Sequence, residues 1–215
     1  MTDQTKERIL DAGEALIAGA GFEGATLRQV TSAAGVNLAA VHYHFGNKEG
    51  LLRAVLARRI APMNAERLTL LDELEGRDEP PALAEVADAF LRPMLAMHHD
   101  EEGRAFIRRL LARFYTDQGA EWIPFFVEQF NVVKERFAAA FRQCLPHLSP
   151  VEIAWRMHFS IGAAAHALAD ECRIEQISGG QCDPHDTESL RRELIRFIVG
   201  GLEISSATES KGGKK

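Results

Sequence analysis

The sequence has 215 residues, of which 46% are hydrophobic and 26% are charged, and its net charge is −6. These proportions fit an ordinary globular protein, and no apolar run approaches the ~18 residues that a membrane-spanning helix needs. The three cysteines, Cys144, Cys172 and Cys182, match no zinc-binding spacing, so we expect free thiols in the cytoplasm and neither a metal nor a cofactor.

Basic residues are concentrated in one segment of the chain. Between Phe22 and Ile60 there are five basic and two acidic residues, so this segment has a net charge of +3 and the rest of the chain carries −9. A small basic module on an acidic body can bind phosphates locally, while the acidic body discourages non-specific coating of nucleic acid. The charge distribution therefore permits nucleic-acid binding without establishing it.

Capping signals near the N-terminus predict three helices joined by short turns. Apolar residues at helical spacing indicate a helix over residues 9–20, which glycines around Phe22 interrupt. Thr26, with a glutamine three residues later, forms a capping box for a helix that ends near residue 34. Gly35 then permits a sharp turn, and Asn37 can cap a helix that ends near residue 45. These three helices form a compact unit.

The rest of the chain also reads as helix, about nine helices in all, and the fold class is all-α. Asn47 can cap a long helix over 48–74, in which Pro62 predicts a kink or a local break. Ser149 opens a helix to about residue 170 that is apolar on nearly all sides and must therefore be buried. We expect further helices at 82–98, 101–116, 121–144 and across 190–202, loops at 75–81 and 174–187, and a disordered tail at 205–215.

The segment from Thr26 to Leu52 has the anatomy of a helix-turn-helix, in which the second helix enters the major groove of DNA. Over about residues 5–55 it resembles the TetR family of repressors. The resemblance rests on the threonine-capped second helix, the turn Ala34-Gly35-Val36, the pair Tyr43-x-Phe45 and the run Lys48-Glu49-x-Leu51-Leu52.

The resemblance implies a helix-turn-helix DNA-binding domain at 1–47 and a helical ligand-sensing and dimerisation domain at 48–204. It also implies a pseudo-palindromic double-stranded operator. We expect Thr26, Tyr43, His44 and Lys48 to contact phosphates. Many relatives have tyrosine where this chain has His42, which leaves the role of His42 open. Base edges would be met by Arg28, Asn37 and His42 through hydrogen bonds, and by Leu38, Ala39 and Ala40 through thymine methyl groups.

Two shorter stretches, 36–41 and 152–165, resemble a subgroup that senses fatty acids or their acyl-CoA thioesters. This resemblance implies a repressor that a small apolar effector releases from its operator. Methionine and phenylalanine side chains suit a long, flexible apolar ligand, although for any single one of them ordinary core packing is the better explanation. The candidate pocket residues are Phe90, Met94, Met97, Ile107, Leu110, Leu111, Phe114, Phe126, Phe130, Met157 and Phe159, and Arg92, Arg104, Arg108 and Arg113 are candidates for a head group.

The last two long helices are the expected dimer interface, since a pair from each subunit would form a four-helix bundle. Two recognition helices must also reach major grooves ~34–36 Å apart. The candidate interface residues are Trp155, Phe159, Gly162, Ala163, His166, Leu194, Phe197, Ile198 and Gly201.

Other classes of function explain the sequence less well. An enzyme would need the acid–base groups at 98–101, but adjacent histidines on a helix do not point to one spot, and no third ligand joins them. A protein-binding helical module explains the helices but not the phosphate-contact residue types between Thr26 and Lys48. Within the DNA-binding class, an aromatic or drug-like effector, or a ligand-free or activating regulator, remains an alternative.

Overall fold

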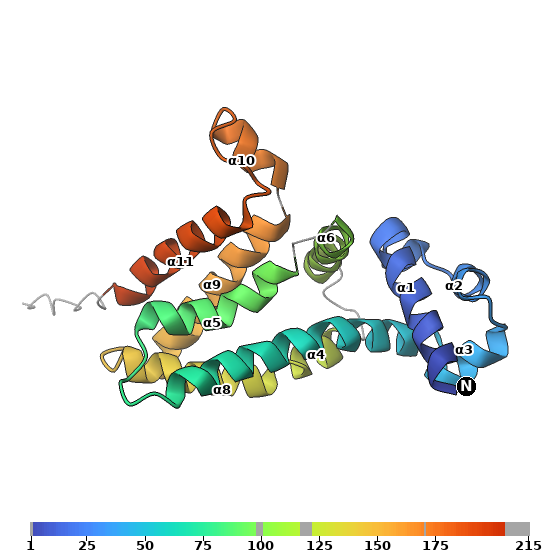
Figure 1. The fold of residues 1–215 in the computed structure, drawn as a ribbon, viewed down its shortest axis with the longest axis horizontal. Coiled ribbons are helices and arrows are strands. Elements are labelled where there is room, and N and C mark those ends of the chain that lie inside the picture. Colours follow the sequence, from blue (N-terminus) through green and yellow to red (C-terminus); the bar gives the residue numbers. More distant parts are fainter. Residues whose placement is uncertain (1, 98–100, 117–121, 170, 205–215) are drawn as a thin grey trace, which may run out of the picture.

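The computed structural model describes residues 2–97, 101–116, 122–169 and 171–204. Within these ranges the chain forms eleven helices and no strand, which confirms the all-helical class (Figure 1). The predicted tail at 205–215 and the acid–base groups His98, His99 and Asp100 lie outside the described residues. No helix in the described part of the chain is both long and apolar enough to cross a membrane.

Eight of the helices correspond to predicted ones, two more divide the helix predicted over 121–144, and one short helix, over 171–177, was not predicted. The helices are α1 (Thr2–Gly24), α2 (Leu27–Ala34), α3 (Leu38–Phe45), α4 (Lys48–Glu75), α5 (Leu83–Ala96), α6 (Glu101–Thr116), α7 (Trp122–Glu128), α8 (Asn131–Cys144), α9 (Pro150–Ala169), α10 (Glu171–Ile177) and α11 (Thr187–Glu203).

Helix α4 runs along the long axis of the molecule (Figure 1). At 28 residues it is about 42 Å long. Figure 1 shows α1, α2 and α3 gathered at its N-terminal end, whereas α5 and α8 pack along the rest of its length and α11 lies beyond α5, on α5 and α9. The helix continues through Pro62, so no break occurs there; this proline is exposed, where its ring meets solvent.

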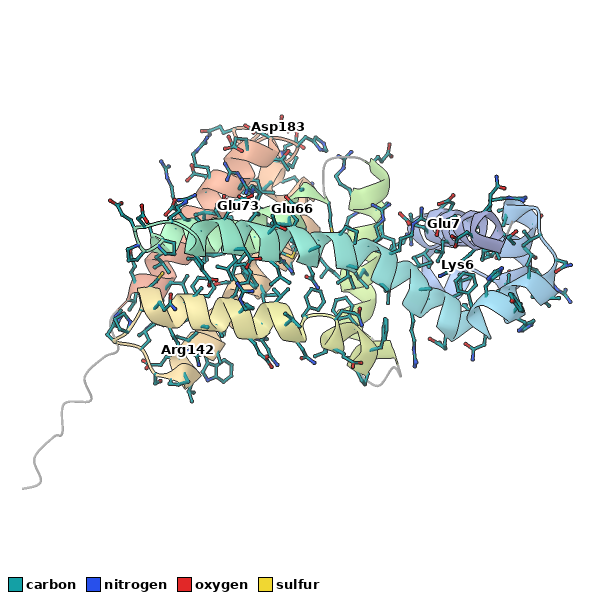
Figure 2. All side chains as sticks on the ribbon, turned by 60° about the horizontal axis from the view of Figure 1, so that its bottom comes forward. Lys6, Glu7, Glu66, Glu73, Arg142 and Asp183 are labelled. Atoms are coloured by element: carbon teal, nitrogen blue, oxygen red, sulfur yellow. The ribbon has the colours of Figure 1, made fainter. Side chains whose placement is uncertain are left out.

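Two hydrophobic cores lie along α4. The N-terminal core joins α1, α2 and α3 to the first half of α4, and it also receives Phe106 and Leu110 from α6. The C-terminal core contains Leu71 and Leu74 of α4 together with α5, α8, α9 and α11. Figure 2 shows α4 and α8 running side by side, with their side chains meeting between them. Both cores therefore depend on one continuous helix.

The helix predicted over 121–144 is two helices, because the chain turns between α7 and α8. Phe126 and Phe130 pack against the N-terminal core, whereas Val133 and Phe137 lie in the C-terminal core. The turn frees the carbonyl oxygen of Gln129, which accepts a hydrogen bond of 2.7 Å from Asn64 Nδ2 on α4. A continuous helix would use that oxygen internally.

The loop predicted over 174–187 begins later than expected, because α10 extends to Ile177. Gly179 and Gly180 then have positive φ angles of 62° and 81°, and the Gly180 N–H donates to the carbonyl of Glu175 at 2.8 Å. This bond closes the helix end in the manner of a glycine C-cap. Ile174 and Ile177 of α10 are exposed and do not form a buried apolar stripe. The spacing of apolar residues therefore did not predict this helix.

The predicted capping boxes are confirmed. Gln29 N–H donates to Thr26 Oγ1 at 3.3 Å, and Thr26 N–H donates to Gln29 Oε1 at 2.9 Å. Ser149 and Glu152 form the same reciprocal pair at the start of α9, at 3.3 and 2.8 Å. Asn47 caps α4 as expected, since its Oδ1 accepts from the Gly50 N–H at 2.8 Å.

Helix α1 is held from two sides. Glu14 on α1 is buried and forms an ion pair with Arg59 of α4, whose guanidinium lies 5.5 Å from the ring centre of Phe106 on α6. From α6, Arg109 donates to the carbonyl oxygens of Ala18, at 2.7 Å from Nε, and of Gly19. These contacts fix the three-helix unit on α4 and α6.

Replacing Glu14 with Gln should lower the free energy of unfolding by about 1–3 kcal/mol, because the change leaves the Arg59 charge without its carboxylate in a mostly buried place. Urea denaturation measures the effect. Glu7→Gln is the matched control on the same helix: Glu7 is exposed and lies 3.8 Å from Arg58, which keeps Asp11 at 2.6 Å. The control should cost below about 1 kcal/mol, and equal losses for the two variants would contradict this role of Glu14.

Candidate DNA interface

The turn between α2 and α3 has the geometry that a helix-turn-helix requires. Gly35 adopts a left-handed conformation, with φ 61° and ψ 41°, and its N–H and that of Val36 close the end of α2 on Ser32 and Thr31. A side chain at Gly35 would meet Arg8 Nη2 at 2.8 Å. That Arg8 nitrogen donates to the Gly35 carbonyl at 3.2 Å, so α1 holds the turn from behind.

Helix α3 buries one residue and exposes the opposite face. Val41 is completely buried in the N-terminal core, whereas Leu38 and Tyr43 are 43% and 78% exposed. An apolar residue and an aromatic residue left in water at one end of a molecule mark an interaction surface. The structure places the predicted contacts Leu38, Ala39, His42 and Tyr43 on the exposed side, with Ala40, His44 and Lys48 half-buried beside them.

Two predicted contact residues already use their side chains within the protein. The Thr26 hydroxyl donates to Gln29 Oε1 at 2.7 Å, and Asn37 Oδ1 accepts from the Ala40 N–H at 2.9 Å. The base contact predicted for Asn37 would therefore have to come from its amide Nδ2. A phosphate near Thr26 would meet the backbone N–H groups of the first turn of α2 rather than the hydroxyl.

His42 is held against the end of its own helix. Its Nδ1 lies 2.6 Å from the carbonyl oxygen of Gly46, a bond in which the ring N–H donates. Nε2 is therefore the ring atom left for a ligand, and in the neutral ring it is an acceptor. The base contact predicted for His42 as a donor would require the protonated ring.

The basic residues between Phe22 and Ile60 lie in two places. Three of them contact α1 or α7, and two lie on the helices that precede and follow α3. Arg58 and Arg59 form ion pairs with acidic residues of α1, so they do not add charge beside α3. Arg53 lies over the Phe125 ring at 5.8 Å from its centre. Arg28 is exposed on α2 and the half-buried Lys48 begins α4, so these two basic residues lie on the helices that precede and follow α3.

The candidate pocket residues separate into two groups. Phe90, Ile107, Leu111 and Met157 pack in or against the C-terminal core, and Leu110, Phe126 and Phe130 pack in or against the N-terminal core. Met94 and Met97 contact both cores. Phe159 is 63% exposed and does not belong with them, and the side chains of Phe114 and Arg113 lie outside the described residues.

Sequence periodicity placed two candidate interface residues wrongly. Leu194 and Ile198 point into the protomer's own C-terminal core, because α11 packs on α5 and α9 with that stripe. Helix α9, which we expect a second subunit to help bury, has an apolar face in water in the single chain. The exposed surface of α9 and α11 contains Trp155, Phe159 and His166, with Phe197 and Gly201, and the half-buried Gly162 and Ala163 adjoin it. Trp155 and Phe159 stack on each other with ring centres 5.6 Å apart.

Known proteins share this arrangement. The family model "Bacterial regulatory proteins, tetR family" matches residues 9–55, and "Tetracyclin repressor-like, C-terminal domain" matches residues 88–201, which is more than half of the chain. The HTH-type transcriptional regulator SrpR of Pseudomonas putida is 39% identical over 64 residues. The chain spans 30% of the length of that relative, and the match covers 30% of this chain.

Solved structures agree in fold over nearly the whole chain. FadR of Bacillus subtilis, in complex with stearoyl-CoA, superposes with a TM-score of 0.68 at 12% identity and covers 91% of this chain and 98% of that one. NalD, the secondary repressor of the MexAB-OprM multidrug efflux pump in Pseudomonas aeruginosa, gives 0.64 at 22% identity, with 94% and 98% covered. At these identities the likeness is one of fold. With both family models matched, the chain belongs to the TetR family of DNA-binding transcriptional regulators.

Proposed function

We propose that this regulator is a homodimeric repressor that binds a pseudo-palindromic operator through α3 and is released by a small apolar effector. The observation that carries the proposal is the exposed face of α3, fixed to one end of α4 while the other end of α4 is built into the C-terminal core. A change in that core can therefore reach the DNA-contacting helix.

Phosphate contacts and base contacts have different places on this surface. Tyr43 and Lys48 lie at the C-terminal end of α3 and the start of α4, where they fit the phosphate backbone. Leu38, Ala39 and Ala40 form the first turn of α3, the part of a recognition helix that meets base edges. Arg28 from α2 is long enough to reach a base or phosphate beside them.

Lys48→Ala should weaken binding to the operator and to unrelated duplex DNA by a similar factor, and should make the salt dependence of the logarithm of affinity shallower by about one. Fluorescence anisotropy titrations at several salt concentrations measure both effects. The matched control is Lys134→Ala, an exposed lysine on α8. If the two variants bind DNA alike, Lys48 is not a phosphate contact.

The exposed apolar surface of α9 and α11 supports a dimer. Trp155, Phe159 and Phe197 are 57%, 63% and 72% exposed. Aromatic residues carry most of the binding energy in many interfaces, and a single chain gains nothing by leaving three of them in water. A second copy that packs the same helices against these residues would complete a four-helix bundle.

Phe159→Glu should convert the dimer to single chains, because the charge would enter an apolar interface without a partner. Light scattering during size-exclusion chromatography checks the mass, and circular dichroism should show an unchanged helix content. Val132→Glu is the control, since Val132 is also an exposed apolar residue but lies on α8. A Phe159→Glu protein that keeps the mass of two chains would exclude this surface as the dimer interface.

The effector class is supported by composition and by one structural relative. Phe90, Ile107 and Met157 are buried in the C-terminal core, and Met94 packs against both cores. Thioether and aromatic side chains adapt to flexible apolar ligands. The FadR structure contains stearoyl-CoA, which favours a fatty acid or an acyl-CoA, whereas NalD regulates a drug efflux pump and makes an aromatic or drug-like effector the second candidate.

A thermal-shift screen distinguishes these effectors. A fatty acid or acyl-CoA at ~100 times its dissociation constant should add ~2.7 kcal/mol of stability, with a dependence on chain length, and should lower operator affinity ~5–150-fold. Aromatic and drug-like compounds form the second arm of the screen. A response confined to that arm would replace the acyl class, and a response to neither would indicate a ligand-free regulator.

A further inference from the structure

Arg67 is a buried cation between the two cores. It lies on α4 between the residues that serve the N-terminal core, up to Met63, and those of the C-terminal core, from Leu68 onwards. Only 3% of its surface is exposed, whereas its neighbour Glu66, labelled in Figure 2, is exposed on α4. The guanidinium carbon is 5.0 Å from the ring centre of Phe90 and 6.0 Å from that of Phe130.

The charge of Arg67 has no carboxylate partner among the described residues, although two other arginines that bridge helices, Arg136 and Arg191, do. Arg136 pairs with two carboxylates of α4, at 2.7 and 2.8 Å, and Arg191 pairs with Asp88 at 2.5 Å. Burial without such a partner lowers the pKa of Arg67 to about 10. The side chain remains a cation at neutral pH, and an uncompensated buried charge is costly.

More than half of the Arg67 donors are unused by the described part of the chain. Nε donates to the carbonyl of Phe90 at 2.7 Å, and Nη1 donates to Asn64 Oδ1 at 3.2 Å. A guanidinium has five N–H donors, so three remain without an acceptor on the described residues. Buried donors in folded proteins almost always have a partner, either protein, water or ligand.

The neighbouring polar groups hold the guanidinium in one orientation. Asn64 Nδ2 donates to the Gln129 carbonyl, which the turn between α7 and α8 leaves free, and this bond directs Asn64 Oδ1 toward Arg67. Asn64 is itself buried. The guanidinium of Arg67 is therefore held at Nε by the Phe90 carbonyl and at Nη1 by Asn64, which the α7–α8 turn keeps in place. Its other N–H donors remain available to a ligand.

We propose that Arg67 binds the carboxylate of the effector, so that the effector is a free acid with an apolar body and not a thioester. The inference rests on the proposed function of this domain as an effector sensor. A carboxylate takes two parallel hydrogen bonds from a guanidinium and neutralises it. Phe90 and Phe130 would contact the carbon chain next to the carboxylate. An acyl-CoA offers only a neutral thioester carbonyl at this point, which would leave the buried charge of Arg67 uncompensated.

The first test uses the unchanged protein and paired ligands. Dodecanoate and 4-phenylbutyrate are each compared with their methyl esters, and dodecanoate also with dodecanoyl-CoA, by thermal shift and by calorimetric titration. At least one acid should bind, at least tenfold more tightly than its ester and, for dodecanoate, its thioester. Equal binding of acid and ester, binding of the thioester alone, or no binding of either acid overturns the proposal.

The second test changes the arginine. Arg67→Met keeps the length and removes the charge, so it should bind the acid at least tenfold more weakly and lose the preference for acid over ester. Arg67→Lys keeps the charge without the planar fork and should retain part of the preference. Arg136→Met removes a half-buried arginine of α8 that pairs with carboxylates of α4, and it should leave the preference unchanged. An Arg67→Met protein that still binds the acid more tightly than the ester overturns the proposal. If this variant does not fold, the comparison of acids with esters on the unchanged protein decides.

Operator binding is measured separately for every variant without ligand. Arg67→Met should bind the operator but no longer be released by the acid. Failure of the unchanged protein to bind any DNA would contradict the proposed function, whereas DNA binding with no preference for acids contradicts only the role of Arg67.

Discussion

The two hydrophobic cores share α4, and the rest of the structure depends on that sharing. When one end of a continuous helix is displaced, the other end moves with it, because its residues cannot move independently without breaking the backbone hydrogen bonds between successive turns. Val55 and Leu56 at one end are completely buried in the N-terminal core, and Leu71 at the other is completely buried in the C-terminal core. The N-terminal core, which holds α3 through Val41, is thus joined by one continuous helix to packing that lies more than half the length of α4 away.

Helix α6 makes a second connection between the same cores. Phe106 belongs to the N-terminal core and the next residue, Ile107, to the C-terminal core, so α6 passes between them. Its Arg109 holds the carbonyl oxygens near the kink of α1 at Gly21, while Arg59 of α4 pairs with Glu14 of α1 and lies against Phe106. Because α1 touches both helices, a change in the angle between α4 and α6 must move α1, and with it the turn that Arg8 supports.

Local signals in the sequence predicted the features that local chemistry decides. The caps at Thr26, Asn37, Asn47 and Ser149 are confirmed, because each joins residues three positions apart. Features decided by distant contacts were missed. The α7–α8 break depends on a bond across 65 positions, from Asn64 to Gln129, and the inward stripe of α11 on its packing with α5 and α9. The charge count over residues 22–60 also could not locate the positive charge on the surface. Arg58 and Arg59 pair with acidic residues of α1, which lie outside that segment.

Burial of Arg67 affects the stability of the folded chain, and a ligand bound to this residue would change that stability. Its pKa is lowered in the folded chain, so the folded state holds the proton less tightly than the unfolded state does. The sign of the linkage follows: the cost to folding is fully present below pH 10 and disappears only as the pH rises toward the ordinary value of arginine. A shift of this size corresponds to about 3 kcal/mol. At neutral pH the protein bears that cost at the junction of its two cores, and a carboxylate bound as proposed would remove it there. Such a ligand would therefore change the stability of the contacts that join α4 to α5 and to the α7–α8 turn.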